Sequence, residues 1–247
     1  RLLTRNKANP DAEFFRDRLK RCLELRKRHL KGATSYRLVN AESDFLSGLI
    51  IDKYEDVLVV QISSLGMELN KETIADCLQE LLSPTAIVER NDTAFRKFEG
   101  LEDQAGTLRG SLEDCQLEIP FGNMKLQLDL DGGHKTGCYL DQQVNQPLTA
   151  ELLPDGNILD AFTFQGGFAI HAALGSQHRQ VTGLDQSETA IQHAATSAQL
   201  NGVESQCAFE CTNVFDWLKA HPAGKARTDE ERPFDGIILD PPSFTRN

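Results

Sequence analysis

The chain has 247 residues, of which 40% are hydrophobic and 26% charged, as in a globular protein of one large or two small domains. It contains no apolar run of the roughly 18 to 20 residues that a membrane-spanning helix needs, which excludes a transmembrane protein. The formal net charge of −11 argues against a generally basic nucleic-acid coat.

The charge is unevenly distributed along the chain. Residues 1–40 contain twelve Lys or Arg and four Asp or Glu, a local balance of +8, which leaves −19 for the rest. A basic N-terminal region followed by an acidic remainder is compatible with an anionic partner that binds the basic region. It is equally compatible with a helix face exposed to solvent. Both interpretations stay open at this point.

The six cysteines are scattered and form no CxxC pair. No His or second Cys pair completes a zinc-binding set, so we expect no metal site. We expect reduced thiols and a cytoplasmic location. No signal peptide is visible, but the chain starts at Arg1 rather than Met, so its targeting stays open.

The first half of the chain predicts a small α+β domain over residues 1–130. Apolar residues at helical spacing predict an amphipathic helix over 11–31, whose other faces are basic. A second helix is expected over 69–82 and ends at Ser83-Pro84. Short strands are expected at 36–39, 48–52, 57–62, 86–89, 116–119 and 125–129.

The second half, residues 131–247, has a regular alternation of strands and helices. After an expected helix over 139–153, four apolar runs end in Asp160, Asp185, Asn213 and Asp240, which are spaced 25, 28 and 27 residues apart. Helices are expected over 166–174, 187–200 and 214–220. Strands that alternate with helices in this way predict βαβ units and a parallel sheet, hence an α/β fold.

Ligands of open α/β sheets bind beyond the carboxyl ends of the strands, so the four polar side chains should meet in one crevice. Gly166 and Gly167 allow the backbone to approach a ligand, but GxGxxG is absent, which disfavours an NAD site. Asp185 stands where an acid accepts hydrogen bonds from ribose hydroxyls. The stiff Asp240-Pro241-Pro242 turn gives an acceptor-rich edge that suits a cationic ligand or a base amino group.

These motifs resemble those of class I S-adenosylmethionine-dependent methyltransferases, with a Rossmann-like domain. Residues 133–142 (GHKTGCYLDQ) are more specific and resemble the signature of the bacterial large-subunit ribosomal RNA cytosine-5 methyltransferases. Residues 35–38, 42–44 and 89–97 are similar to the central domain of that family. The resemblance runs from about residue 11 to the end of the chain.

The resemblance implies S-adenosylmethionine as cofactor and large-subunit ribosomal RNA as partner, with no metal and no membrane. Asp240 would be the catalytic residue and would position the target base. The cofactor-binding residues would be Lys135, Tyr139, Gln142, Asp160, Phe164, Gln165, Gly166, Gly167, Asp185, Asn213, Val214, Asp240 and Pro241. Of these, Asp185 would hold the ribose hydroxyls, and Asn213 with Val214 would meet the adenine.

The chain departs from the family at several points. Gln143 stands where Arg is usual, Asn213 where an acid is common, and Cys138 where an aromatic is usual. Four strands correspond to the first four of the seven-stranded family sheet, so we expect an incomplete methyltransferase domain. Cytosine C5 needs a Cys thiolate to add at C6, and the family's nucleophile would lie beyond residue 247.

The expected function is formation of 5-methylcytosine in 23S ribosomal RNA, although this fragment itself is expected to be inactive. Two alternatives remain. One is a purine N-methyltransferase on RNA with the same cofactor site, and the other is a non-catalytic RNA-binding module. If the protein is a ribosomal RNA enzyme or a non-catalytic RNA-binding module, the basic helix over 11–31 would contact RNA phosphates.

Overall fold

The computed structural model describes residues 10–92, 94–113, 118–128, 130, 137–221 and 233–242. The chain forms two compact units. Unit 1 comprises residues 1–117 and 129–140, and unit 2 comprises residues 118–128 and 141–247. Each unit has its own sheet and its own core, and each is described separately below.

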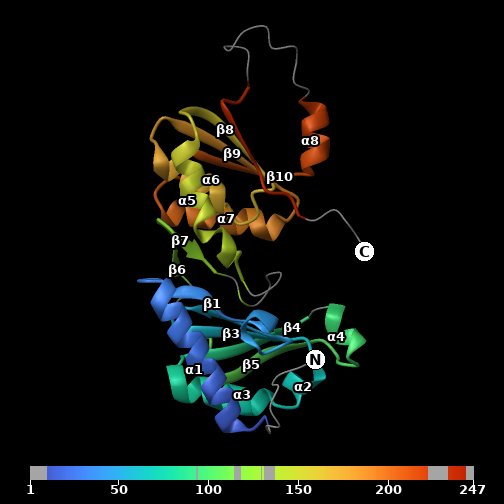
Figure 1. Ribbon diagram of the computed structural model, residues 1–247. Helices are drawn as coiled ribbons and strands as arrows, with labels where there is room; N and C mark the ends of the chain where they lie inside the picture. The colour runs from blue at the N-terminus through green and yellow to red at the C-terminus, as the bar shows by residue number, and fades with distance from the viewer. Residues whose placement is uncertain are drawn as a thin grey trace. The chain divides into compact units, whose positions relative to one another are not determined.

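Unit 1 is built on a five-stranded mixed sheet in the order β1-β2-β3-β4-β5 (Figure 1). Only β3 and β4 pair in parallel, and the other neighbours are antiparallel. The strands are β1 (Ser35–Asn40), β2 (Leu49–Tyr54), β3 (Val57–Ile62), β4 (Ala86–Asn91) and β5 (Gln104–Gly110). The helices are α1 (Ala12–His29), α2 (Leu65–Glu68), α3 (Lys71–Leu82) and α4 (Ala94–Phe98), with a 3-10 turn η1 (Ala41–Asp44).

Helix α1 starts and ends where its sequence favours it. Asp11 caps the first turn by accepting a hydrogen bond from the Phe14 N–H at 3.0 Å. The last turn is basic, with Arg26, Lys27, Arg28 and His29, which complements the negative end of the helix dipole. The helix expected over residues 11–31 is therefore present over nearly its full length.

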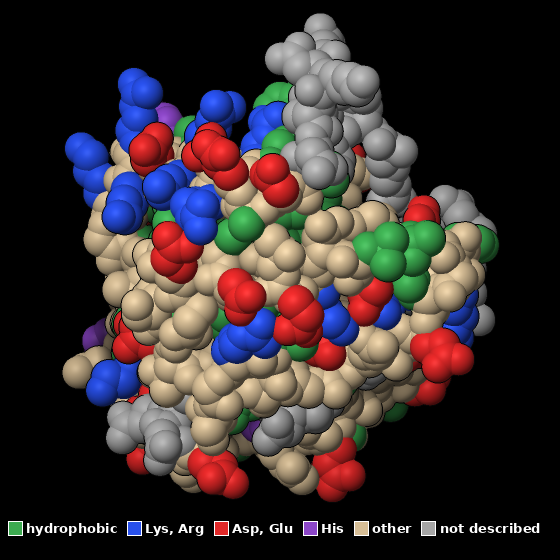
Figure 2. Space-filling model, turned by 90° about the horizontal axis from the view of Figure 1, so that it is seen from below, with side chains coloured by type: hydrophobic (Ala, Val, Ile, Leu, Met, Phe, Trp, Pro, Cys, Tyr) green, Lys and Arg blue, Asp and Glu red, His purple; other side chains and the backbone are tan. Residues whose placement is uncertain are grey.

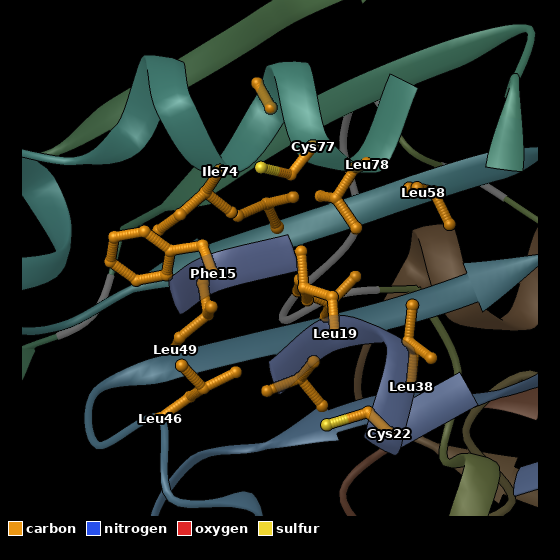
Figure 3. Close-up of a cluster of buried hydrophobic side chains, with 14 of the residues drawn as sticks. Phe15, Leu19, Cys22, Leu38, Leu46, Leu49, Leu58, Ile74, Cys77 and Leu78 are labelled. Carbon is orange, nitrogen blue, oxygen red and sulfur yellow. The ribbon is translucent and has the colours of Figure 1, made fainter. Parts of the chain in front are cut away.

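The core of unit 1 lies between the sheet and the two long helices α1 and α3. Figure 3 shows side chains of both helices directed toward the same set of strand residues. Phe15 and Leu19 from α1 and Leu78 from α3 are fully buried. Burial of such side chains contributes about 1.5 to 3 kcal/mol each, so these contacts stabilise the unit.

Strand β5 was not expected from the sequence. Its residues QAGTLRG carry two glycines and little apolar alternation, so no strand pattern is visible there. It forms because β4 offers an antiparallel partner edge. Gly110 is required at its end, because a Cβ atom there would lie 1.9 Å from the Thr85 carbonyl oxygen.

Unit 2 contains a four-stranded sheet in the order β10-β9-β8-β11, in which every neighbouring pair is parallel. The strands are β8 (Gly156–Ala161), β9 (Arg179–Asp185), β10 (Cys207–Cys211) and β11 (Gly236–Leu239). The strand order reverses between β8 and β11. In open α/β sheets, such a reversal marks the position of a ligand crevice.

The helices of unit 2 cover both faces of the sheet, with α8 on the face opposite to α6 (Figure 1). They are α5 (Asn145–Leu152), α6 (Gly167–Gly175), α7 (Glu188–Leu200) and α8 (Val214–Ala220). A hydrophobic cluster that includes Leu159, Leu184 and Val214 joins the sheet to α8. The α/β character expected for this half of the chain is therefore present.

The helix expected over residues 139–153 is divided in two. A 3-10 turn, η2 (Leu140–Gln143), precedes α5. Pro147 lies in the first turn of α5, where its missing N–H leaves no helical hydrogen bond unmade. None of the described helices is long and apolar enough to cross a membrane.

The boundary between the two units differs from the one expected at residue 130. The hairpin of β6 (Glu118–Phe121) and β7 (Met124–Gln127) belongs to unit 2. The Lys125 N–H donates to Asn201 Oδ1 at 2.9 Å, and Asn201 Nδ2 donates to the Lys125 carbonyl at 2.7 Å. The Asn123 N–H lies 3.3 Å from His171 Nε2, its acceptor. These backbone contacts could not be inferred from composition.

Candidate functional site

The parallel sheet of unit 2 brings the predicted polar strand ends to one edge. Asp185 is the last residue of β9 and pairs in register with Cys211 at the end of β10. Asp160 is the second-to-last residue of β8. It pairs with Ile238 of β11, which lies two residues before Asp240. Since all four strands run in the same direction, their carboxyl ends share this edge, and the predicted convergence is present.

Asp160 lies beneath the loop that follows β8. It is 1% exposed, and its Oδ2 accepts hydrogen bonds from Thr163 Oγ1 at 2.6 Å and from the Ala169 N–H at 3.1 Å. Burial, with the charges of Asp240 and Asp185, raises the pKa of Asp160 from 3.8 to about 7. The carboxyl group thus ties β8 to the first turn of α6.

The loop between β8 and α6 is held in an uncommon backbone conformation. Phe162, Phe164 and Gly166 have φ angles of 68°, 51° and 81°. Such values are rare for bulky side chains and persist only where surrounding contacts impose them. Here the Phe164 N–H donates to Asp185 Oδ2 at 3.0 Å, and the Thr163 N–H donates to the Leu184 carbonyl at 2.8 Å.

The glycine pair of this loop is required by close packing. A Cβ atom on Gly166 would lie 3.0 Å from the Cβ of Ala194 in α7. A Cβ atom on Gly167 would lie 2.3 Å from the side-chain nitrogen of Gln146 in α5. Both glycines therefore allow the start of α6 to approach neighbouring helices.

Three buried acceptor atoms surround the start of α6 without a hydrogen-bond donor among the described residues. They are Asp160 Oδ1, Gln165 Oε1 and Gln146 Oε1. The three residues are 1%, 4% and 7% exposed. Buried polar atoms are nearly always satisfied in folded proteins, so unsatisfied ones need a reason. Acceptors of this kind suit a ligand that brings N–H or O–H donors or a positive charge.

Asp240 is positioned by a short chain of side-chain amides. Gln142 Nε2 donates to Asp240 Oδ2 at 3.0 Å, and Asn145 Nδ2 donates to Gln142 Oε1 at 2.8 Å. This connection joins η2 and α5 to the end of β11. Asp240 and Pro241 are both exposed, so the carboxylate and the turn face solvent at the strand edge.

Asp185 and Asn213 also have local structural roles. Asp185 Oδ1 accepts from the Ser187 N–H at 2.9 Å, and each carboxylate oxygen keeps a second lone pair for a ligand. Asn213 Oδ1 caps α8 by accepting from the N–H groups of Phe215 at 3.0 Å and Asp216 at 3.3 Å. Val214 is 3% exposed and packs in the core, so only its backbone can face a ligand.

Two predicted residues are not among the described residues of unit 2. Lys135 lies outside the described residues. Tyr139 belongs to unit 1 and is 40% exposed. Conversely, Thr163 and Gln146 lie in the site although the sequence analysis missed them. Thr163 stands beside the predicted Phe164, whereas Gln146 lies four residues after the predicted Gln142 and has no sequence signal of its own.

Two thiols of the described residues are largely buried, and the described residues contain no metal cluster. Burial raises the pKa of the Cys207 thiol to about 12 and that of Cys22 to about 11, which keeps both protonated. Within the described part of the chain, no group of three or more His, Cys, Asp or Glu residues could hold a metal ion.

Comparison with known proteins agrees with this architecture. Residues 152–240 match the family model described as a methyltransferase domain. The matched segment contains the four parallel strands β8 to β11 and the loop between β8 and α6, and thus includes Asp160, Asp185 and Asp240.

Curated relatives cover nearly the whole chain. It is 39% identical over 240 residues to ribosomal RNA large subunit methyltransferase I of Klebsiella pneumoniae, and 36% identical over 242 residues to that of Vibrio cholerae. These alignments include 96% of this chain but 58% and 59% of the relatives. The chain therefore spans less than two thirds of the length of these relatives.

Solved structures share the fold at lower sequence identity. A Streptococcus mutans protein described as a SAM-dependent methyltransferase superposes with a TM-score of 0.81 at 20% identity, covering 98% of this chain and 61% of that one. The methyltransferase SMU.776, complexed with SAH, gives 0.82 at 22% identity and covers 100% of this chain and 62% of that one. The chain thus has the class I methyltransferase fold.

Proposed function

We propose that this chain is part of an S-adenosylmethionine-dependent methyltransferase that forms 5-methylcytosine in large-subunit ribosomal RNA. The observation that carries the proposal is the set of unsatisfied acceptors, Asp160 Oδ1, Gln165 Oε1 and Gln146 Oε1, around the start of α6. The relatives named as ribosomal RNA large subunit methyltransferase I support the RNA substrate. The SAH complex of SMU.776 supports the cofactor.

The buried acceptors fit the charge of this cofactor. S-adenosylmethionine supplies a methyl group on a positively charged sulfonium, and it also carries an ammonium group. Asp160, Asp185 and Asp240 place three carboxyl groups at one sheet edge, where the described residues show no ion pair to a cation. A cationic ligand with N–H donors would satisfy the orphaned oxygens and offset the local negative charge.

The residues at the strand ends would divide the binding of the cofactor among them. The second lone pairs of the Asp185 carboxylate would accept from the ribose hydroxyls. The oxygen of Asn213 caps α8, so an adenine contact would fall to its amide nitrogen. The Gly166 backbone and the strained Phe164 would define the wall of the site.

Asp240 would orient the target base. Gln142 and Asn145 hold its carboxylate, which limits its freedom before the base arrives. Methyl transfer is a displacement at carbon along one line, so its rate depends on the alignment of base, methyl and sulfonium. The protein's task in this proposal is to fix that alignment and to exclude water.

Calorimetric titration of S-adenosylmethionine tests the cofactor assignment. We expect Asp185→Ala to weaken binding at least tenfold, because a hydrogen bond to a charged acceptor contributes about 1.5 to 3 kcal/mol. Asp155→Ala is the control with the same charge change, since Asp155 precedes β8 at the opposite edge of the sheet. Equal affinity in the wild type and Asp185→Ala would refute the assignment.

Folding of the variant is checked separately. Asp185→Ala removes the acceptor for the Phe164 N–H as well. Asp185→Asn keeps an acceptor there but loses the charge, and it should bind the cofactor with an intermediate affinity. The circular dichroism of both variants should match that of the wild type.

The methylated atom is tested in cells. Deletion of the gene that carries this chain should remove one 5-methylcytidine from large-subunit ribosomal RNA, measured by mass spectrometry of the nucleosides. Loss of a methylated purine instead would overturn the cytosine assignment and leave the cofactor assignment intact. No change in any methylated nucleoside would overturn the proposed activity.

A further inference from the structure

Five residues of α1 lie along one side of the helix at spacings of four, three, four and three. They are Phe14, Arg18, Arg21, Leu25 and Arg28, which we call the arginine stripe. Residues three and four apart are neighbours on a helix surface. Leu25 is 48% exposed, and Arg21 and Arg28 are exposed. Phe14 and Arg18 are half-buried, so Arg21, Leu25 and Arg28 form the outer part of the stripe.

Phe45 projects from the turn after η1 in a conformation that is unfavourable for its side chain. Its φ of 59° and ψ of 28° lie in the left-handed region, which usually takes Gly or Asn after a helical turn. A bulky residue there carries a strain of about 1 to 3 kcal/mol. Phe45 is also 64% exposed, so burial of the ring recovers little of this energy. Folding alone does not account for a phenyl ring at this position.

The turn that carries Phe45 is fixed to α1. Asp44 accepts hydrogen bonds from Arg26 Nη1 at 2.7 Å and from Arg26 Nη2 at 2.6 Å, with both side chains largely buried. Leu46 on the other side of Phe45 is fully buried. The guanidinium carbon of Arg18 lies 5.5 Å from the centre of the Phe45 ring. The ring is thus held beside the arginine stripe.

We propose that the arginine stripe and Phe45 form a contact surface of unit 1 for single-stranded RNA. Exposed aromatic rings stack on unpaired bases, and arginine binds phosphate through its planar fork of donors. Phe45 would stack on one base, and Arg21 and Arg28 would bind the adjacent phosphates. Because the turn that carries the ring is already fixed, little backbone entropy is lost on binding. This inference rests on the proposed function and extends it to the substrate.

The charge of this part of the chain fits an RNA partner. Two other cations of α1 are used internally, since Arg16 pairs with Glu80 and Arg26 with Asp44. In Figure 2, Lys and Arg side chains gather at the upper left of the face in view, with Asp and Glu side chains among them. A merely solvated helix face would account for exposed arginines, but not for the strained, exposed ring of Phe45.

Fluorescence anisotropy with a labelled single-stranded RNA of about twelve nucleotides tests the surface. Phe45→Gly should weaken binding about tenfold, because a base stack is lost. The same change should leave the stability of the chain equal or higher, because glycine relieves the left-handed strain. Phe98→Ala is the control, since Phe98 is also an exposed phenylalanine of unit 1, at 87%. It should not change the affinity.

The salt dependence tests the arginines. Arg21→Gln with Arg28→Gln should lower the slope of log affinity against log salt concentration by about 1.4, since each phosphate contact on a single strand contributes about 0.7. Lys97→Gln with Lys125→Gln removes the same charge from two other exposed positions. The Lys97/Lys125 double variant should lower this slope by less than half of the change expected for the Arg21/Arg28 double variant.

Three outcomes would overturn the inference. The first is a wild-type chain that does not bind the RNA, which would leave a protein partner as the explanation of the surface. The second is an equal effect of Phe45→Gly and Phe98→Ala, and the third is an equal slope in the two double variants. Cofactor titration separates the two proposals, because Phe45→Gly should bind S-adenosylmethionine as the wild type does.

Discussion

Buried charged groups are treated differently in the two units. In unit 1, Arg96 is 1% exposed and lies 2.9 Å from Glu68, and Lys71 lies 2.9 Å from Glu89. In unit 2, the buried Asp160 accepts only neutral donors among the described residues, and one of its oxygens accepts none. Unit 1 thus neutralises these buried charges with charged partners, whereas Asp160 of unit 2 has none among the described residues.

The presence or absence of a charged partner distinguishes a buried group that stabilises the fold from one that can bind a ligand. A buried charge with a charged partner is satisfied within the fold, and its removal destabilises the protein. A buried carboxyl group without one has a shifted pKa and is a candidate for ligand binding. The comparison predicts that substitutions of the buried charged residues of unit 1 act on stability, whereas the substitution of Asp160 changes how stability depends on pH.

The largest expected effect is that of Arg96→Met in unit 1. Arg96 Nη1 donates to the Ile62 carbonyl at 2.7 Å, and Nε donates to the Glu102 carbonyl at 2.8 Å. The substitution leaves the two carbonyl oxygens without this donor and leaves Glu68 with Lys71, at 3.0 Å, as its remaining cationic partner. We expect the free energy of unfolding, measured in urea, to fall by about 3 to 5 kcal/mol.

An exposed arginine provides the control for this prediction. Arg109 pairs with Glu72 and Asp76, which are 68% and 70% exposed. Arg109→Met should reduce the free energy of unfolding by less than about 1 kcal/mol. Similar losses in both variants would contradict the view that unit 1 depends on its buried ion pairs.

The next effect concerns Asp160→Asn in unit 2. Because burial raises the pKa of Asp160 to about 7, the folded chain keeps a proton that the unfolded chain releases above about pH 4. This group therefore makes the free energy of unfolding fall as the pH rises from about 4 to 7. The slope for one proton is about 1.4 kcal/mol per pH unit.

Asparagine cannot titrate, so Asp160→Asn should remove this component of the pH dependence. Urea unfolding at several pH values between 4 and 8 measures it. Asp103→Asn, at an exposed position of unit 1, is the control and should leave the profile of the wild type. An unchanged profile in Asp160→Asn would show that the carboxyl group is not desolvated.

The smallest effect is that of Asn213→Ala at the start of α8. The side-chain oxygen of Asn213 satisfies two N–H groups of the first turn. Loss of such a cap reduces the free energy of unfolding by about 1 kcal/mol. Asn213→Asp should keep the stability, since Asp caps helices as well as Asn does. A drop in both variants would show that the amide nitrogen matters more than the cap.

Much of the fold follows from patterns in the sequence. The helical spacing of Phe15 and Leu19 predicts α1, because one apolar stripe must be buried. The regular alternation up to Asp240 predicts the parallel strands β8 to β11. Strand β5 was not predictable, because its pairing depends on the free edge of β4 rather than on its own residues.

The site was predictable only in part. The sequence indicates which strands end in an acid, but not how deeply each acid lies. The resemblance predicts that Asp160 contacts the cofactor, and the structure shows its carboxyl group hydrogen-bonded to Thr163 and to the Ala169 N–H. Gln146 was missed, because its approach to Gly167 depends on how α5 packs against α6. Such proximity is a property of packing, which a single sequence does not encode locally.

The hairpin of β6 and β7 determines how unit 2 can be produced separately. His171 Nε2 accepts the Asn123 N–H, and its Nδ1 lies 2.8 Å from the Gly167 carbonyl, so the ring links the hairpin to the glycine pair. An expression clone that begins at residue 131 would remove Asn123 and Lys125, the partners of His171 and Asn201. A clone that begins at residue 118 retains both and is therefore the better choice for producing unit 2 separately.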